Sequence, residues 1–116
     1  MEHRRELGAR AERFAVDLLV AAGYRIVDRN FRCKAGEIDI VARDGDILVF
    51  VEVRSRSDGE HGGAVEMIGR AKQRQVVRVA RVYLAAAAPA FEQCRFDVVA
   101  ITGGEAILIQ DAFRAS

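Results

Sequence analysis

The sequence predicts an α/β fold in which helices pack on a mixed β-sheet, with the element order α-β-β-β-α-β-β. Two long segments, residues 4–22 and 69–88, place apolar residues at helical spacing, whereas the remaining apolar runs are short, β-branched and bounded by turn residues. A chain of 116 residues that is 51% hydrophobic can form one core, and no linker or repeat divides it. We therefore expect a single domain over residues 1–116.

The N-terminal half predicts one helix and three strands, at residues 4–22, 24–33, 37–43 and 46–54. In the helix, apolar side chains that include Phe14 recur three and four positions apart. Gly23 ends the helix, because glycine accepts the left-handed conformation of a helix end. The second and third strands are joined by Asp44-Gly45, a favoured two-residue hairpin turn.

The C-terminal half predicts a second helix and two strands, at residues 69–88, 94–101 and 106–110. Pro89 closes the helix, since proline cannot continue the hydrogen-bonding pattern. Thr102, Gly103 and Gly104 separate the two strands. The last strand is apolar enough either to pair at a sheet edge or to pack inside, and the sequence leaves both arrangements open.

Three carboxylates interrupt the apolar hairpin, and strand alternation predicts that they meet. Glu37 and Asp39 share one face of their strand, while Ile38 and Ile40 take the other face. With the two-residue turn given above, Glu37 lies opposite Glu52 in the next strand. Asp39 is then a diagonal neighbour of Glu52, roughly 7 Å away at the backbone. A slip of one residue would separate them.

Like charges this close repel each other unless a cation offsets them, and oxygen ligands favour Mg²⁺ or Mn²⁺. The alternative is a solvated sheet face that carries all three acids. Leu48 and Phe50 argue against it, because they share that face and need cover. The geometry therefore favours a metal site at this cluster of acids.

Two side chains of the helices could approach this cluster. Glu12 lies at the margin of the apolar face of the first helix, where it either reaches over the sheet toward the hairpin or stays solvated. Lys72 falls among apolar residues near the start of the second helix. A lysine in such a position must extend to solvent, pair with an acid or face a site.

Basic segments flank the acidic hairpin. Residues 1–34 hold eight Arg or Lys against five acids, residues 54–81 hold seven against three, and residues 35–53 hold one against five. A metal-dependent site acting on a polyanion would require this distribution, although random surface charge also produces it. The second helix carries a basic stripe that could follow phosphates or form a solvated face, made of Arg70, Arg74, Arg78 and Arg81.

Other classes of protein are disfavoured by composition. No apolar run is long enough to span a membrane, and the charged N-terminus does not resemble a secretory signal, so we expect a cytoplasmic protein without membrane contact. Cys33 and Cys94 are expected to be reduced, half-buried thiols, and the scattered Cys and His residues disfavour structural zinc.

An acid in one strand followed by "EVR" in the next resembles the Asp…Glu-x-Lys signature of PD-(D/E)XK nucleases. Nearly the whole chain is similar to the YraN family of uncharacterised bacterial proteins. The similarity lies in "GARAERFAVDLLVAAGYRIVDRNFRCKAGEIDIVARDGDILVFVEVRSR", "AKQRQVVRVARVYL", "CRFDVVAI" and "DAF". That family resembles archaeal Holliday-junction resolvases, which implies a restriction-endonuclease-like mixed sheet flanked by helices.

The resemblance implies roles for individual residues. Glu12 corresponds to the helix acid of the resolvase-like site, and Asp39 and Glu52 correspond to the two metal-binding acids. The carbonyl of Val53 is implied as a further ligand, and Lys72 matches a lysine at the start of the second helix. Mg²⁺ would polarise the scissile phosphate and lower the pKa of an attacking water. The residues expected to contact nucleic acid are Arg32, Lys34, Arg56, Arg70, Arg74 and Arg78.

Arg54 departs from the family pattern, because lysine usually occupies this catalytic position. The pKa of arginine, above ~12, prevents it from acting as a base. Either the site is degenerate and still binds nucleic acid, or arginine is tolerated there. Of the 18 basic residues only Lys34 and Lys72 are lysines, so the composition favours arginine generally. Lys72 could then substitute for the missing lysine.

The expected function is a nuclease that uses Mg²⁺ or Mn²⁺ to hydrolyse phosphodiester bonds in DNA, with branched DNA as a candidate substrate. One alternative is a catalytically degenerate nucleic-acid-binding module with the same fold. Another is a protein-interaction domain that has lost the chemistry, since fold alone does not decide function. By analogy with the resolvases we also expect a homodimer, because a four-way junction needs two cuts.

Overall fold

The computed structural model describes residues 2–56 and 68–115, and the side chains of residues 8–55 and 68–115. Its elements follow the predicted order α-β-β-β-α-β-β. They are α1 (Glu2–Ala21), β1 (Arg25–Cys33), β2 (Gly36–Asp44), β3 (Ile47–Arg56), α2 (Arg70–Ala87), β4 (Gln93–Thr102) and β5 (Glu105–Phe113).

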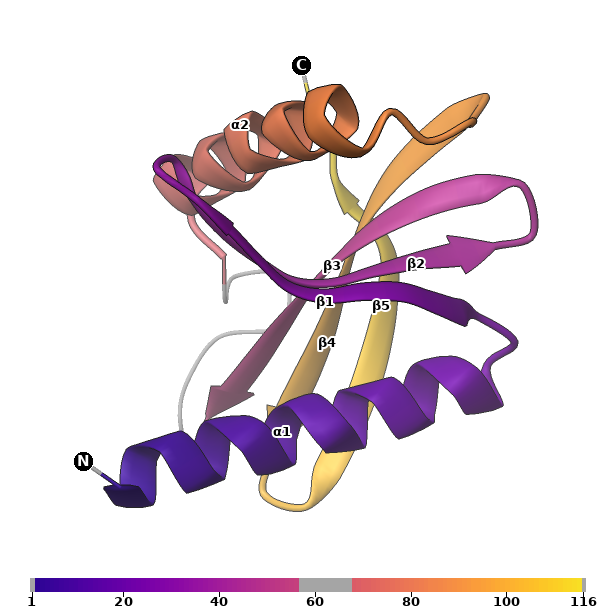
Figure 1. Cartoon of the computed structure of the whole chain (residues 1–116). Coiled ribbons are helices and arrows are strands. Elements are labelled where there is room, and N and C mark those ends of the chain that lie inside the picture. The colour runs from indigo at the N-terminus through magenta and orange to yellow at the C-terminus, as the bar shows by residue number, and fades with distance from the viewer. Residues whose placement is uncertain (1, 57–67, 116) are drawn as a thin grey trace.

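The five strands form one mixed sheet in the order β1-β2-β3-β4-β5. β3 and β4 run parallel, whereas the other neighbouring pairs run antiparallel. A parallel pair needs a crossover connection, and α2 lies within it. Figure 1 shows α1 on one face of the sheet and α2 on the other. The central strand β3 is therefore covered on both faces.

Two hydrophobic cores fill the spaces between the sheet and its helices. Successive residues of β3 alternate between them, with Leu48 and Phe50 in the core under α2 and Val49 and Val51 in the core under α1. The α2 core also contains Tyr83, whose ring meets Phe50 edge to face with centroids 5.9 Å apart. Because β3 is fixed from both sides, its polar residues are held in position as well.

Both helices end close to where the sequence predicts. Gly23, at φ 96°, follows α1 in the left-handed region that glycine tolerates. α2 begins after Gly69 and is followed by Ala88, also left-handed, and then by Pro89. Over the residues that the structure describes, neither helix is long and apolar enough to cross a membrane.

The hairpin between β2 and β3 differs in register from the prediction. Its turn is Gly45-Asp46 rather than Asp44-Gly45, and Asp44 pairs with Ile47. Gly45 takes the left-handed conformation, with φ 61°. Because the register changes by two residues, paired side chains still share a face, but each residue has a different partner across the hairpin.

The predicted alternation of β2 is wrong at one point. Ile38 packs in the core under α2, whereas Ile40 packs in the core under α1, although they are two positions apart. In a regular strand they would lie on one face. The alternation therefore breaks at Asp39, which lies between them.

The exposure of several residues differs from what the sequence pattern predicts. Phe14 is 40% exposed, because α1 contacts the sheet mainly through Ala15 and Leu19, both fully buried. Cys33 and Cys94 are free, as predicted, but Cys94 is exposed rather than half-buried. The terminal strand β5 extends beyond its predicted bounds and is an edge strand, with Ile107 59% exposed.

A buried polar network joins β4 to the start of β1. Asp97 is fully buried and accepts hydrogen bonds from the Tyr24 hydroxyl at 2.6 Å, Arg95 Nε at 2.8 Å and the Asp111 backbone N–H at 2.9 Å. Arg95 also donates to Asp44 at 2.8 Å. Burial and the bond to Asp97 raise the pKa of Tyr24 to about 12. The network balances a charge that would otherwise be costly inside the protein.

Replacing Asp97 by asparagine should destabilise the fold. The Asp97→Asn change leaves the Arg95 cation without its buried partner, and we expect the free energy of unfolding to fall by about 3–5 kcal/mol. Urea unfolding followed by circular dichroism measures it. The control is Asp111→Asn, which breaks only an exposed ion pair to Arg114 and should cost less than about 1 kcal/mol. Equal losses in the two variants would contradict the assignment.

Candidate functional site

Asp39 and Glu52 meet where β2 and β3 separate. The paired register ends at Ile40 and Val51, and one further step places Asp39 opposite Glu52. The Val53 N–H donates to Asp39 Oδ2 at 2.8 Å, and the Asp39 N–H donates to Glu52 Oε2 at 3.4 Å. Each carboxylate thus accepts a hydrogen bond from the backbone of the opposite strand. The predicted meeting of these acids is found, but as direct rather than diagonal neighbours.

Two cations lie beside Glu52, which is only 2% exposed. Arg54 Nη2 is 3.6 Å and Lys72 Nζ is 3.8 Å from the same atom, Glu52 Oε1. Arg54 follows Glu52 by two residues and therefore shares its face of β3, whereas Lys72 comes from the first turn of α2. Of the three outcomes that the sequence allows for Lys72, the structure shows pairing with an acid.

Both acids are harder to ionise than free carboxyl groups, chiefly because they are buried. Burial, reinforced by the charge of Asp39, raises the pKa of Glu52 to about 7, although Lys72 and Arg54 oppose the shift. Burial also raises the pKa of Asp39, against the hydrogen bond from the Val53 N–H. A cation bound to both carboxylates would favour their charged forms and lower both pKa values.

The described residues supply too few side chains to surround a metal ion completely. Across residues 2–56 and 68–115, no three His, Cys, Asp or Glu side chains gather closely enough to enclose a metal. Mg²⁺, however, usually keeps several waters and binds proteins through one or two carboxylates. Asp39 and Glu52 are therefore the residues of this site that could hold such an ion, with water as the remaining ligands.

Glu12 lies on the α1 side of this site but is bound to β1. Its Oε1 accepts hydrogen bonds from Arg29 Nη2 at 2.8 Å, Arg29 Nε at 3.1 Å and Asn30 Nδ2 at 3.0 Å. Glu12 lines the same hollow as Asp39, and its charge contributes to the raised pKa of Asp39. The sequence contains no local signal for Arg29 and Asn30 as partners, since they are distant in the chain.

The hollow over Asp39 has a volume of about 430 Å³ and opens between α1 and the hairpin. Gly8, Ala9 and Ala11 form its α1 wall, and a Cβ added at Gly8 would meet nothing within 4 Å. Small side chains on α1 therefore leave Asp39 accessible. Arg32 also lines the hollow, where it pairs with Glu37 at 3.1 Å.

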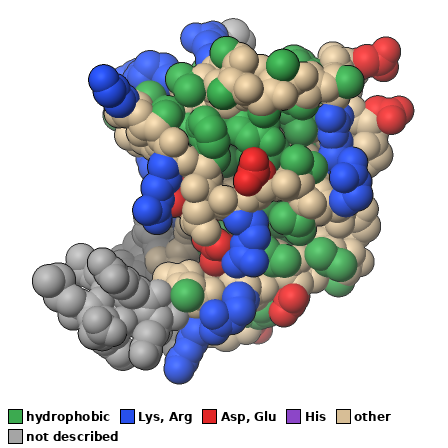
Figure 2. Space-filling view, viewed as in Figure 1, with side chains coloured by type: hydrophobic (Ala, Val, Ile, Leu, Met, Phe, Trp, Pro, Cys, Tyr) green, Lys and Arg blue, Asp and Glu red, His purple; other side chains and the backbone are tan. Residues whose placement is uncertain are grey.

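The residues expected to contact nucleic acid lie on two surfaces. Arg32 and Lys34 are exposed at the end of β1 and just after it, and Arg70, Arg74 and Arg78 are exposed on α2. Figure 2 shows Lys and Arg side chains over α2 at the upper left of the view. Arg56 ends β3, and its side chain lies outside the described part of the chain.

The stability of the protein should depend on pH through Glu52. Its pKa of about 7 in the folded state exceeds the ordinary 4.5, so its contribution to stability is complete below pH 4.5 and is lost as the pH rises through 7. In EDTA, Glu52→Gln should therefore raise the free energy of unfolding at pH 8, by up to about 3 kcal/mol. Urea unfolding at pH 4 and pH 8 measures this, with the exposed Glu105→Gln as control. An unchanged pH profile in Glu52→Gln would contradict the raised pKa.

Comparison with known proteins identifies a family. Residues 11–101 match the group described as Uncharacterised protein family UPF0102. A UPF0102 protein of Symbiobacterium thermophilum is 44% identical over 96% of this chain and 98% of its own length. Those of Aeromonas hydrophila and Herminiimonas arsenicoxydans are 46% and 42% identical, over 91% and 97% of this chain and 83% and 90% of their own lengths. The chain therefore belongs to the UPF0102 family, the YraN-like family that its sequence resembles.

Proposed function

We propose that this protein is a Mg²⁺-dependent nuclease that hydrolyses phosphodiester bonds in DNA. The observation that carries the proposal is the meeting of Asp39 and Glu52 at the separated ends of β2 and β3, with Lys72 on Glu52. The resemblance to PD-(D/E)XK nucleases and the mixed sheet between two helices support it. The restriction-endonuclease-like fold belongs to the same proposal.

Asp39 and Glu52 would hold Mg²⁺ (or Mn²⁺), with the Val53 carbonyl as a further ligand. When bound, the ion supplies Lewis-acid stabilisation of charge on the scissile phosphate. Arg54 would bind a phosphate oxygen. The guanidinium is partly exposed and so can be reached by a substrate, whereas its Nε is buried and has no hydrogen-bond partner among the described residues.

Lys72 takes the role that lysine usually has at the position of Arg54. Both side chains reach Glu52 Oε1, at nearly equal distances of 3.8 Å and 3.6 Å. An ammonium group is a compact charge on a flexible stem that can approach a water molecule, whereas the planar guanidinium group matches paired oxygens of a phosphate. Lys72 therefore orients the attacking water or neutralises developing charge, and Arg54 binds phosphate.

The hollow between α1 and the hairpin gives the substrate its path to Asp39. The small residues Gly8, Ala9 and Ala11 leave room there for a phosphodiester group. Glu12, held by Arg29, lies at the rim of the same hollow and helps to fix α1 against β1. Its role in this proposal is to position the wall of the site.

One observation favours a second candidate, a nucleic-acid-binding module without catalysis. Glu52 already has two cations at its carboxylate, so part of its negative charge is offset without a metal. In that case Arg54 and Lys72 maintain the fold, and exposed arginines on α2 bind the nucleic-acid backbone. The two candidates differ in their need for divalent metal.

The Asp39→Asn variant separates the two candidates. We expect it to lose Mn²⁺ binding in calorimetry and to cleave labelled branched, single-stranded or duplex DNA at least about 100-fold more slowly than the wild type. Asp46→Asn, an exposed acid in the turn of the same hairpin, is the matched control and should behave as wild type. DNA binding without metal, combined with no cleavage by the wild type, would instead establish the second candidate.

The division of roles between the two cations can be tested directly. Lys72→Ala should lower kcat by about 100-fold or more, because it removes the ammonium group that orients the attacking water or neutralises developing charge. Arg54→Lys should retain activity, since a lysine there still carries the charge. Steady-state cleavage at several pH values measures both variants. If Lys72→Ala cleaves normally while Arg54→Ala is inactive, the assignment of roles is wrong.

A further inference from the structure

A second hollow lies between the start of α2 and the end of β5, away from the acids. It has a volume of about 560 Å³, and arginines from both elements line it, namely Arg70, Arg74 and Arg114. We propose that this hollow binds phosphate groups of the nucleic-acid strand that enters or leaves the cleavage site. The inference rests on the proposed function in so far as nucleic acid is the ligand.

The arginines converge from segments that are far apart in the sequence. Arg70 and Arg74 lie one helical turn apart on α2, whereas Arg114 follows β5. Among the described residues that line the hollow, none is Asp or Glu. Three cations at one concave surface, without an acid on its lining, favour an anionic ligand.

The chemistry of the lining suits phosphate in particular. A guanidinium presents paired N–H donors that match two phosphate oxygens, and such charge-assisted bonds are strong. Val77 and Phe113 supply an apolar floor beneath the arginines. Among the described residues, Arg114 pairs with Asp111 at 3.0 Å, an exposed ion pair that a phosphate can displace at low cost.

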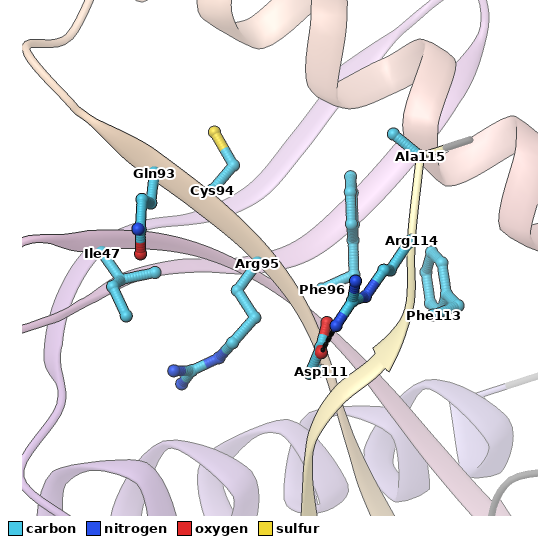
Figure 3. Close-up of a pocket in the computed structure, with 9 residues that line it drawn as sticks. All are labelled: Ile47, Gln93, Cys94, Arg95, Phe96, Asp111, Phe113, Arg114 and Ala115. Carbon is cyan, nitrogen blue, oxygen red and sulfur yellow. Dashed lines mark hydrogen bonds and ion pairs between the residues drawn. The ribbon is translucent and has the colours of Figure 1, made fainter.

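Arg114 also borders a neighbouring hollow, which Figure 3 shows in close-up. There the side chain of Arg95 points away from Arg114, in keeping with its bonds to Asp97 and Asp44. Asp111 adds a negative charge to that lining. An anion is therefore favoured on the α2 side of Arg114 rather than on this side.

The position of the hollow relates it to the proposed active site. Lys72, which reaches Glu52, stands between Arg70 and Arg74 in the sequence of α2. At 100° per residue, Lys72 points to the opposite side of the helix from both arginines. The proposed active site and the hollow thus lie on opposite sides of the same turn of α2. A helix is roughly 10 Å across, a distance that a few nucleotides of one strand can span.

The basic stripe of α2 provides a matched control. Arg78 and Arg81 are exposed and continue the stripe, but they do not line the hollow. If only total charge matters, all arginines of the stripe should contribute equally to binding. If the hollow is the binding site, Arg74 and Arg114 should matter, and Arg81 should not.

The test measures binding in EDTA, where cleavage plays no part. Fluorescence anisotropy with a labelled DNA duplex, between 50 and 200 mM salt, gives the affinity and its salt dependence. Arg74→Ala and Arg114→Ala should each weaken binding several-fold and reduce the slope of log K against log salt by about 0.9. Arg81→Ala should leave the slope unchanged.

Equal effects of Arg81→Ala and Arg74→Ala would overturn the inference, as would unchanged slopes in Arg74→Ala and Arg114→Ala. Polyglutamate that competes as well as unlabelled DNA would overturn the assignment to phosphate. A cleavage assay on the same variants keeps the two proposals distinguishable. If the salt slopes change as expected but the protein never cleaves DNA, the hollow is a phosphate-binding site and the proposed nuclease activity is refuted. If the protein cleaves DNA but the slopes of the variants are unchanged, the nuclease is supported and the phosphate-binding role of the hollow is refuted.

Discussion

The separation of β2 from β3 after Ile40 and Val51 is the constraint on which the proposed site depends. Beyond that pair, the strands no longer bond backbone to backbone, and Asp39 and Glu52 accept the N–H groups instead. This arrangement satisfies polar groups that burial would otherwise leave unpaired. It also brings two carboxylates together inside the protein. Burial raises the pKa of both, and the charge of Asp39 adds to the shift of Glu52.

The position of α2 decides which cation is available. Gln75 Nε2 donates to the Ala35 carbonyl at 3.0 Å and so attaches the helix to the turn between β1 and β2. Gly36 permits this contact, because a Cβ there would lie 2.7 Å from Gln75 Nε2 and its φ is 142°. The same docking brings Lys72 to Glu52. Gly36, through its contact with Gln75, thus helps α2 to lie where Lys72 reaches Glu52 in β3.

Local patterns explain what the sequence could predict. Strand alternation placed Asp39 and Glu52 together, and helical spacing made Lys72 conspicuous among apolar neighbours. The hairpin register was wrong because Asp44-Gly45 and Gly45-Asp46 both suit a two-residue turn, and packing on both faces of β3 decides between them. Strict alternation could not reveal the break at Asp39, since it arises where the strands separate.

Long-range partners were beyond local patterns. Glu12 is held by Arg29 of β1, a contact that depends on how α1 lies across the sheet. Arg95 and Asp97 did leave a signal, because two charges alternate in an otherwise apolar strand, but their partner Tyr24 is 73 residues from Asp97. That network and the acids of the proposed site are both clusters of buried charge, yet they differ in how well their carboxylates are compensated by donors and cations. Asp97 accepts hydrogen bonds from donors of three residues, whereas Glu52 has a raised pKa despite two cations. Burying carboxylates whose ionised forms are disfavoured costs stability, and in the proposed function a cation bound to them would offset that cost.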